Sequence, residues 1–278
     1  LSVKSTDNLP PTGNNIPSET DPADIRFAFQ NIHGAMLDAG LSLPNEIEAI
    51  SDWSIDIMGM PETNHPWSSK QKTDHDYMMT SRFASSRTIY TSVPSPSHDM
   101  KCLPGGNLLT INGHTTGRIS GSGSDEWGRF CWYTLLGLRN EESAMKQVTN
   151  QEHSQLTNNS TRPCGRRDIS KLITDKRHQG FCPILMMDAN GDYNGKDKDL
   201  AAFLMQAGLS NPFYDKFNFS PTTYSYGKPR LDYMLVDPAL THAIKQVGYL
   251  GTHNGALSDH VMAVIDFDEK ELFVGILN

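Results

Sequence analysis

Apolar and polar positions alternate along several short segments of this chain, and a period of two residues is typical of half-buried strands. Residues 25–32 (IRFAFQNI) and 55–60 (IDIMGM) predict two such strands. Between them, 44–51 predicts a short helix, because a proline precedes apolar positions three residues apart. Residues 181–187 (FCPILMM) form a continuous apolar run, which indicates a strand covered on both faces. The pattern therefore predicts a domain that mixes strands and helices.

The same periodicities predict the remaining elements. The expected strands are 87–92, 106–111, 129–136, 230–236, 247–250 and 261–267, and the expected helical segments are 166–178, 197–208 and 238–245. Residues 121–128 are rich in glycine and serine and predict a loop. Residues 140–164 are rich in Asn, Gln, Ser and Thr, and no strand is expected there. No repeat with a period of about 20 to 50 residues occurs, which excludes a solenoid.

The composition is that of a globular protein and excludes several classes. The 278 residues are 37% hydrophobic and 20% charged. No run approaches the roughly 18 apolar residues of a membrane-spanning helix, so no membrane partner is expected. The four cysteines lack C-x-x-C spacing, which argues against zinc. With 24 basic and 32 acidic residues the net charge is −8, which disfavours nucleic-acid binding through bulk positive charge but leaves room for a local basic patch.

The first residues predict a flexible leader rather than part of the domain. Residues 1–23 are polar, contain three prolines before residue 18, and begin with Leu rather than Met. They also lack the apolar core of a secretory signal. We therefore expect a leader at 1–23, a domain at 24–278, a larger parent polypeptide, and an intracellular location.

Polar residues recur where the predicted apolar strands end, which is where catalytic side chains are usually found. These residues are Asn31, Glu62, Asp188, Asn190, Asp259 and His260. Hard divalent cations such as Mg²⁺ prefer oxygen ligands, so Glu62 with either Asp259 or Asp188 is a chemically suitable set. His260 supplies a group that can carry positive charge near a phosphorane, and Asp232 could orient it. Together these residues predict phosphoester hydrolysis.

Each of these motifs also has a purely structural interpretation. An Asp-x-Asn after a strand is usually a turn, and a Ser-Asp-His triplet is more often a cap or a turn. The basic residues of 162–177 are more typical of a solvated helix face than of a DNA-binding face. The four tryptophans, Trp127 among them, are more often core or loop anchors than base-stacking platforms.

Four motifs in sequence order carry a resemblance to a known family. They are 29–34 (FQNIHG), 57–63 (IMGMPET), 230–233 (RLDY) and 257–260 (LSDH). Over residues 25–267 the chain resembles the endonuclease/exonuclease/phosphatase superfamily, which has the deoxyribonuclease-I-like fold. Three further segments, 105–109 (GGNLL), 117–119 (GRI) and 127–130 (WGRF), make it most similar to the endonuclease domains of non-LTR retroelements.

The resemblance implies a fold and a set of residue roles. The fold would be a four-layer α/β sandwich, with two packed mixed β-sheets flanked by helices. Mg²⁺, with Mn²⁺ as a substitute, would be held by Glu62 and Asp259 with Asn31 nearby. Asp188 would activate the water, while Asn190, Asn31 and His260 would bind the substrate phosphate. His260, with Asp232 behind it, would stabilise the transition state, and DNA cleaved in the nucleus would be left with a 5′-phosphate and a 3′-hydroxyl.

Three features depart from the family pattern. His33 stands where the family has Asp or Asn, so either the ion has fewer oxygen ligands or His33 points away. The Asp-x-Asn motif occurs at 188–190 and again at 192–194, and the first copy is preferred because it adjoins the apolar strand. Finally, no strand that would carry a phosphate-facing Tyr or His is found between 137 and 165. We expect either that this strand is lost or that Tyr133 and its neighbours shift register to replace it.

Three functional hypotheses follow. The first is a Mg²⁺-dependent DNA endonuclease domain of a retroelement-like polyprotein. The second keeps the fold and metal but takes a phosphomonoester or a phospholipid headgroup, which a narrow closed pocket would favour over a basic groove. The third is a catalytically impaired remnant that binds nucleic acid or a partner, motivated by His33 and the missing strand.

Overall fold

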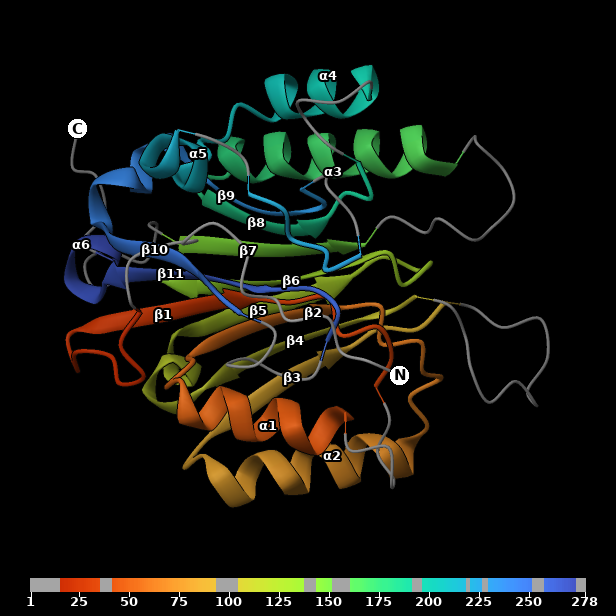
Figure 1. Cartoon of the computed structure of the whole chain (residues 1–278), viewed down its shortest axis with the longest axis vertical. Coiled ribbons are helices and arrows are strands. Elements are labelled where there is room, and N and C mark those ends of the chain that lie inside the picture. Colours follow the sequence, from red (N-terminus) through yellow and green to blue (C-terminus); the bar gives the residue numbers. More distant parts are fainter. Residues whose placement is uncertain are drawn as a thin grey trace.

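Two β-sheets pack face to face, with a pair of helices outside each of them (Figure 1). The computed structural model describes residues 16–35, 42–93, 105–137, 144–151, 161–191, 197–218, 221–226, 230–251 and 258–273. The second Asp-x-Asn motif, at 192–194, lies outside these ranges.

The larger sheet has six strands in the order β10-β11-β1-β2-β4-β3. Their bounds are β1 Asp24–Phe29, β2 Ile57–Pro61, β3 Ser86–Tyr90, β4 Asn107–Asn112, β10 Ile244–Leu250 and β11 Met262–Asp268. Strands β1 and β2 are parallel, and the other neighbours are antiparallel, so the sheet is mixed. Asn31 and Glu62 follow the carboxyl ends of β1 and β2, which places them at one edge of this sheet.

The smaller sheet has five strands in the order β5-β6-β7-β8-β9. Their bounds are β5 Ile119–Ser124, β6 Phe130–Leu136, β7 Ala144–Gln151, β8 Cys182–Asp188 and β9 Asp232–Val236. Strands β7 and β8 are parallel, so this sheet is also mixed. Asp188 at the end of β8 lies opposite Asp232 at the start of β9, which brings two carboxylates to one edge.

The helices form the two outer layers. Helices α1 (Ser42–Asp52) and α2 (Ser69–Arg82) cover the larger sheet, and α3 (Thr161–His178) and α4 (Lys198–Ala207) cover the smaller one (Figure 1). Shorter segments are η1 Gly113–Arg118, α5 Pro212–Phe217, η2 Pro238–Ala243 and α6 Glu269–Phe273. One apolar cluster fills the space between the sheets, and two others lie beneath the helix pairs. The expected four-layer sandwich is therefore confirmed.

The elements expected from periodicity are present, with ends shifted by a few residues. Among the described residues, no helix combines the length and the apolar character needed to span a bilayer. The chain before β1 also contributes to the domain from Ile16 onward. Ile16 is buried in the cluster under α1 and α2, and the Arg26 guanidinium donates to the carbonyls of Pro17 and Ser18.

The prediction that no core strand exists between 137 and 165 is wrong, because β7 lies in the middle of the smaller sheet. It pairs with β6 on one side and with β8 on the other, and Tyr133 lies on β6 opposite Gln147 rather than replacing the strand. The segment AMKQVTNQ has no apolar alternation, yet backbone N–H and C=O groups pair whatever the side chains are. Gln151, its last residue, lies opposite Asp188 at the sheet edge.

The predicted loop at 121–128 is also partly wrong, because β5 continues to Ser124. It is an edge strand, and packing against the neighbouring strand requires the glycine at position 123. A Cβ added to Gly123 would lie 2.2 Å from the Trp132 ring on β6. The indole therefore occupies the space that a side chain at this position would need.

One buried acid in the helical layer makes stability depend on pH. Glu46 is buried on α1 beside the core residues Leu43, Ile47 and Ile50, and burial raises its pKa from 4.5 to about 8. The unfolded chain releases this proton at lower pH than the folded chain does. Stability is therefore fully present below pH 4.5 and falls as the pH rises to about 8.

We expect Glu46→Gln to match the unsubstituted chain near pH 4.5 and to exceed it by on the order of 4 kcal/mol above pH 8, because the amide has no proton to release. Urea denaturation at several pH values measures this difference. Glu48→Gln, at an exposed position on the same helix, is the matched control. A gain that is the same at every pH would contradict the assignment.

Candidate active site

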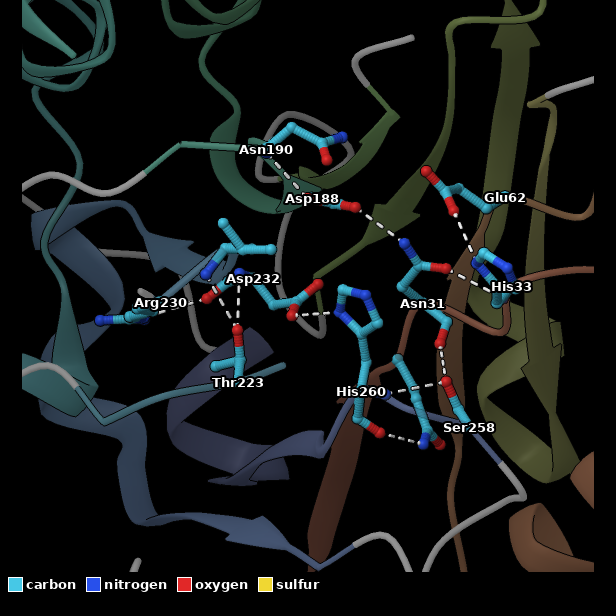
Figure 2. A network of polar contacts seen from close by, with 12 residues as sticks. Asn31, His33, Glu62, Asp188, Asn190, Thr223, Arg230, Asp232, Ser258 and His260 are labelled. Carbon is cyan, nitrogen blue, oxygen red and sulfur yellow. Dashed lines mark hydrogen bonds and ion pairs between the residues drawn. The ribbon is translucent and has the colours of Figure 1, made fainter. Parts of the chain in front are cut away.

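Asn31 joins the two sheets at the edge where their strands end (Figure 2). Its side-chain Nδ2 donates a 2.7 Å hydrogen bond to Asp188 Oδ2. The other oxygen of Asp188 accepts a 2.8 Å hydrogen bond from the backbone N–H of Asn190. Both Asn31 and Asp188 are buried, so this contact links β1 to β8 in a site with little water.

Asp232 and His260 form a second buried contact beside the first. His260 Nδ1 lies 2.7 Å from Asp232 Oδ2, which is hydrogen-bonding distance. The ring of Tyr224 also packs against His260, with ring centroids 5.0 Å apart. The imidazole is thus held in one orientation by a carboxylate and an aromatic ring.

The backbone around Asp232 is fixed by two neighbouring side chains. Thr223 Oγ1 accepts hydrogen bonds from the N–H groups of Leu231 and Asp232, at 2.9 and 3.1 Å. Arg230 Nε donates to the Asp232 carbonyl at 2.9 Å, and its guanidinium lies over the Tyr233 ring. These contacts preorganise the carboxylate that holds His260.

The loop before His260 is tied to the end of β1. The hydroxyl of Ser258 donates to the Asn31 carbonyl and accepts from the His260 N–H at 3.1 Å. Gln30 Nε2 donates to the His260 carbonyl at 2.7 Å. The catalytic candidates of β1 and of the last loop therefore move as one unit.

Glu62 and His33 lie on the more open side of Asn31. Both have left-handed backbone conformations, with φ of 56° and 47°. His33 donates its backbone N–H to Asn31 Oδ1 at 2.9 Å, and its Nδ1 lies 3.6 Å from Glu62 Oε2. His33 therefore faces Glu62, although its side chain is 69% exposed. Left-handed backbone at non-glycine residues is strained and is typical of functional sites.

The acidity of Asp188 is shifted by its surroundings. Burial raises the pKa of this carboxyl well above its ordinary value, and the nearby Asp232 and Glu62 carboxylates raise it further. His260 and the Asn190 N–H oppose the shift. A raised pKa means that the Asp188 carboxylate, once ionised, binds a proton more strongly than an ordinary aspartate, which is the property of a general base.

His260 has the opposite character. Burial alone would lower its pKa, but the charge and hydrogen bond of Asp232, with further contributions from Asp188 and Asp259, raise the pKa to about 9. The imidazole is therefore a cation at neutral pH. A fixed positive charge in a buried site stabilises negative charge that develops nearby.

The site contains carboxylate oxygens that are suited to a divalent cation. Asp232 Oδ1 and Asp259 Oδ1 are buried and have no hydrogen-bond partner among the described residues. Asp188, Asp232 and His260 also bring potential ligand atoms within 4.8 Å of one another. His260 is an unsuitable ligand, however, because its Nδ1 bonds to Asp232 and its ring is cationic. The donor set that fits a hard cation is therefore carboxylate.

No protein-family model matches the sequence, and no curated protein matches it either. Solved structures do match over nearly the whole chain. The AP endonuclease LMAP from Leishmania major aligns with a TM-score of 0.68 and 16% identity, covering 96% of each chain. The endonuclease domain of TRAS1, a telomere-specific non-LTR retrotransposon, aligns with a TM-score of 0.58 and 12% identity, covering 89% of this chain and 99% of that domain.

A third match is D. rerio TDP2 in complex with a single-strand DNA product, with a TM-score of 0.59, 14% identity, and coverage of 88% of this chain and 98% of that one. Proteins described as endonuclease/exonuclease/phosphatase family members match at similar TM-scores. This chain has the endonuclease/exonuclease/phosphatase fold. The resemblance inferred from the four sequence motifs is thereby confirmed.

The endonuclease/exonuclease/phosphatase fold brings most of the candidate residues together. Asn31, Asp188, Asn190, Asp232 and His260 form one connected network with the contacts described above. Glu62 lies within electrostatic reach of Asp188, and Asp259 within that of His260. Asn31 is bonded to His33, which faces Glu62, and to Ser258, the residue that precedes Asp259.

The structure adds supporting residues to which the sequence analysis assigned no role. Gln30, Thr223, Tyr224 and Ser258 hold the network, and a polar or aromatic residue in a loop gives no sequence signal for such a role. Arg166 is a further one, although the sequence favours a solvated helix face for the basic residues of 162–177. It is buried, pairs with Asp197 at 3.0 Å, and donates to the Ala189 carbonyl beside Asp188 at 3.4 Å.

Proposed function

We propose that this protein is a metal-dependent phosphodiesterase and that its substrate is DNA. The observation that carries the proposal is the buried pairing of a cationic His260 with Asp232, directly beside the high-pKa carboxyl of Asp188. A proton acceptor and a fixed cation at one buried edge are the two groups that hydrolysis of a phosphodiester requires.

Glu62 and Asp259 are the residues that would hold the cation, together with Asn31 Oδ1. A carbonyl oxygen has two lone pairs, and the His33 N–H uses only one of those on Asn31. A divalent ion bound there would supply charge that polarises the phosphoryl oxygens and acidifies water. We propose Mg²⁺, with Mn²⁺ as a substitute, because the donors are oxygens.

The side chains of this chain then have separate tasks. Asp188, oriented by Asn31 and by the Asn190 N–H, accepts a proton from the attacking water. The amide of Asn190 and the imidazolium of His260 bind the phosphate oxygens. His260 stabilises the charge that builds up in the transition state, and Asp232 keeps it protonated. In-line attack leaves a 5′-phosphate and a 3′-hydroxyl.

Two observations support DNA and a retroelement-type endonuclease over a phosphomonoester or lipid headgroup. The segments 105–109, 117–119 and 127–130 resemble those of retroelement endonucleases more than those of the other branches. One structurally similar protein is a retrotransposon endonuclease domain, and another was solved with a DNA product. We place the enzyme in a larger nuclear polypeptide on the same grounds.

We expect the protein to nick supercoiled plasmid in Mg²⁺ or Mn²⁺ and to lose this activity in EDTA. Glu62→Ala should reduce nicking at least about 100-fold, because it removes a proposed cation ligand. Gel analysis of relaxed and supercoiled plasmid measures the rate, and calorimetry measures Mg²⁺ binding. Glu48→Ala, on the exposed face of α1, is the control. Nicking that survives both EDTA and Glu62→Ala would refute the proposal.

A further inference from the structure

An exposed tryptophan lies at the tip of the hairpin that joins β5 to β6. Trp127 is 54% exposed, whereas the other three tryptophans, all within the described residues, are buried or half-buried. A single exposed apolar side chain is common on protein surfaces and by itself indicates no partner. Tryptophan is nevertheless enriched at interfaces, where its ring supplies a large contact area. The surrounding structure shows that this exposure is not the result of a loose loop.

The hairpin tip is closed by Asp125. Its Oδ1 accepts hydrogen bonds from the N–H groups of Arg129 and Phe130, at 2.7 and 3.1 Å. Its carbonyl accepts the N–H of Gly128 at 3.3 Å. The chain on either side of Trp127 is therefore bonded to one residue, and the turn has a defined shape.

The tip is also anchored to the larger sheet. The carbonyl of Gly128 accepts hydrogen bonds from Asn107 Nδ2 at 2.9 Å and from Thr91 Oγ1 at 3.1 Å, and both side chains are buried. Gly128 has φ of 68°, and a Cβ there would lie 2.3 Å from the Ser92 carbonyl oxygen. Only glycine fits this close approach. Two sheets thus hold Trp127 in a fixed position while its ring stays in water.

This position is beside the candidate active site. Asn107 lies opposite Pro61 in the pairing of β4 with β2, and Pro61 directly precedes Glu62. The path from Glu62 runs through its neighbour Pro61 and across one strand spacing to Asn107. From Asn107 one hydrogen bond leads to Gly128, the residue after Trp127, so Glu62 and Trp127 are separated by a distance on the order of 15 Å. On the smaller sheet, the first residue after the tip, Phe130, lies level with the end of β7.

The charges around Trp127 exclude a simple phosphate-binding role. Asp125 and Glu126 precede it, and the only cation of the tip, Arg129, bonds to Asp125 at 2.6 Å and to Asp168 at 2.8 Å. The tip therefore has no uncommitted positive charge for a backbone phosphate. Binding to a membrane surface needs several apolar residues combined with basic ones, whereas the tip has a single exposed apolar ring. The accessible chemistry of the tip is the flat apolar face of one indole.

We propose that Trp127 stacks on a nucleobase of the substrate strand a short distance from the scissile phosphodiester. This inference rests on the proposed function, and it names a subsite for that function. Stacking of a base on an aromatic ring tolerates any sequence and needs an unpaired or everted nucleotide. The subsite distinguishes a nucleic-acid substrate from a small phosphoester, which has no base to occupy it.

The test is binding of a fluorescein-labelled single-stranded DNA oligonucleotide in EDTA, which prevents cleavage. Fluorescence anisotropy should show about 5- to 100-fold weaker binding for Trp127→Ala, the range expected for one stacked base, and near-native binding for Trp127→Phe. An oligonucleotide of abasic tetrahydrofuran units, with the same charge but no bases, should bind equally to the native chain and to Trp127→Ala. Thermal melting confirms that each variant is folded.

Tyr77→Ala is the matched control, because Tyr77 is 76% exposed on the outer helix α2, and its binding should be unchanged. Unchanged binding by Trp127→Ala would overturn the inference, as would an equal loss on the abasic strand. If Trp127→Ala kept its binding to DNA but lost binding to anionic phospholipid vesicles, the inference would be overturned in favour of a lipid surface. Base-dependent binding without any nicking would leave the subsite standing and refute the proposed catalysis, so the two failures are distinguishable.

Discussion

His260→Ala is expected to lower the rate of metal-dependent plasmid nicking by about 1,000-fold. The substitution removes the buried cation that Asp232 holds in place, and loss of one preorganised charge or donor in an active site typically costs about 100- to 1,000-fold in rate. Single-turnover nicking at saturating protein measures the chemical step, and DNA binding in EDTA measures affinity. We expect the rate to fall far more than the affinity, because the cation acts mainly in the transition state.

Two controls separate catalysis from folding. His260→Ala leaves the buried Asp232 without its partner, which destabilises the fold, whereas the double variant His260→Ala/Asp232→Ala removes both. The double variant should melt at a higher temperature than the single variant and remain inactive. His114→Ala, at a half-exposed histidine that contacts Glu269, should nick normally. A folded His260→Ala protein with native activity would disprove the assigned role.

Arg26→Ala is expected to destabilise the protein by about 3 to 5 kcal/mol. Arg26 is fully buried on β1, and its guanidinium bonds to both carboxylate oxygens of Asp266 on β11, at 2.7 and 2.9 Å. It also donates to the carbonyls of Pro17 and Trp53. Removing it leaves a buried carboxylate and several carbonyls without this hydrogen-bond donor, which costs more free energy than the loss of one attraction. Urea denaturation at pH 7 measures the change.

The double variant Arg26→Met/Asp266→Leu provides the comparison. It removes both charges and keeps apolar volume, so it should recover a large part of the stability lost in Arg26→Ala. Exposed Lys245→Ala, which loses a surface contact with Asp24, should change stability far less than Arg26→Ala does. If Arg26→Ala were no more harmful than Lys245→Ala, the buried pair would not have the assigned importance.

The candidate site could be predicted from sequence because each of its residues stands next to a recognisable strand. Asn31 and Glu62 follow apolar strands of the larger sheet, and Asp188 ends an apolar strand of the smaller one. His260 lies two residues before the last strand. Apolar strand followed by a polar residue is a local signal, so each candidate could be found without knowledge of the fold.

The elements that were not predicted depend on distant partners. Strand β7 is polar and is fixed by backbone pairing with β6 and β8, which no local pattern reports. Gly123 of β5 is explained only by the Trp132 ring on the neighbouring strand. Helix α2 was also not predicted, but it has a local signal, because Ser68 and Gln71 form a capping box at its start.

The hydrogen bond from Asn31 to Asp188 determines when the candidate site can assemble during synthesis of the chain. Its two residues belong to different sheets, and His260 is among the last residues of the domain to leave the ribosome. In a nascent or half-assembled domain, Asn31, Asp188 and His260 are therefore apart. The network of the candidate site forms only once both sheets have docked, so any activity that depends on it must follow the completion of folding.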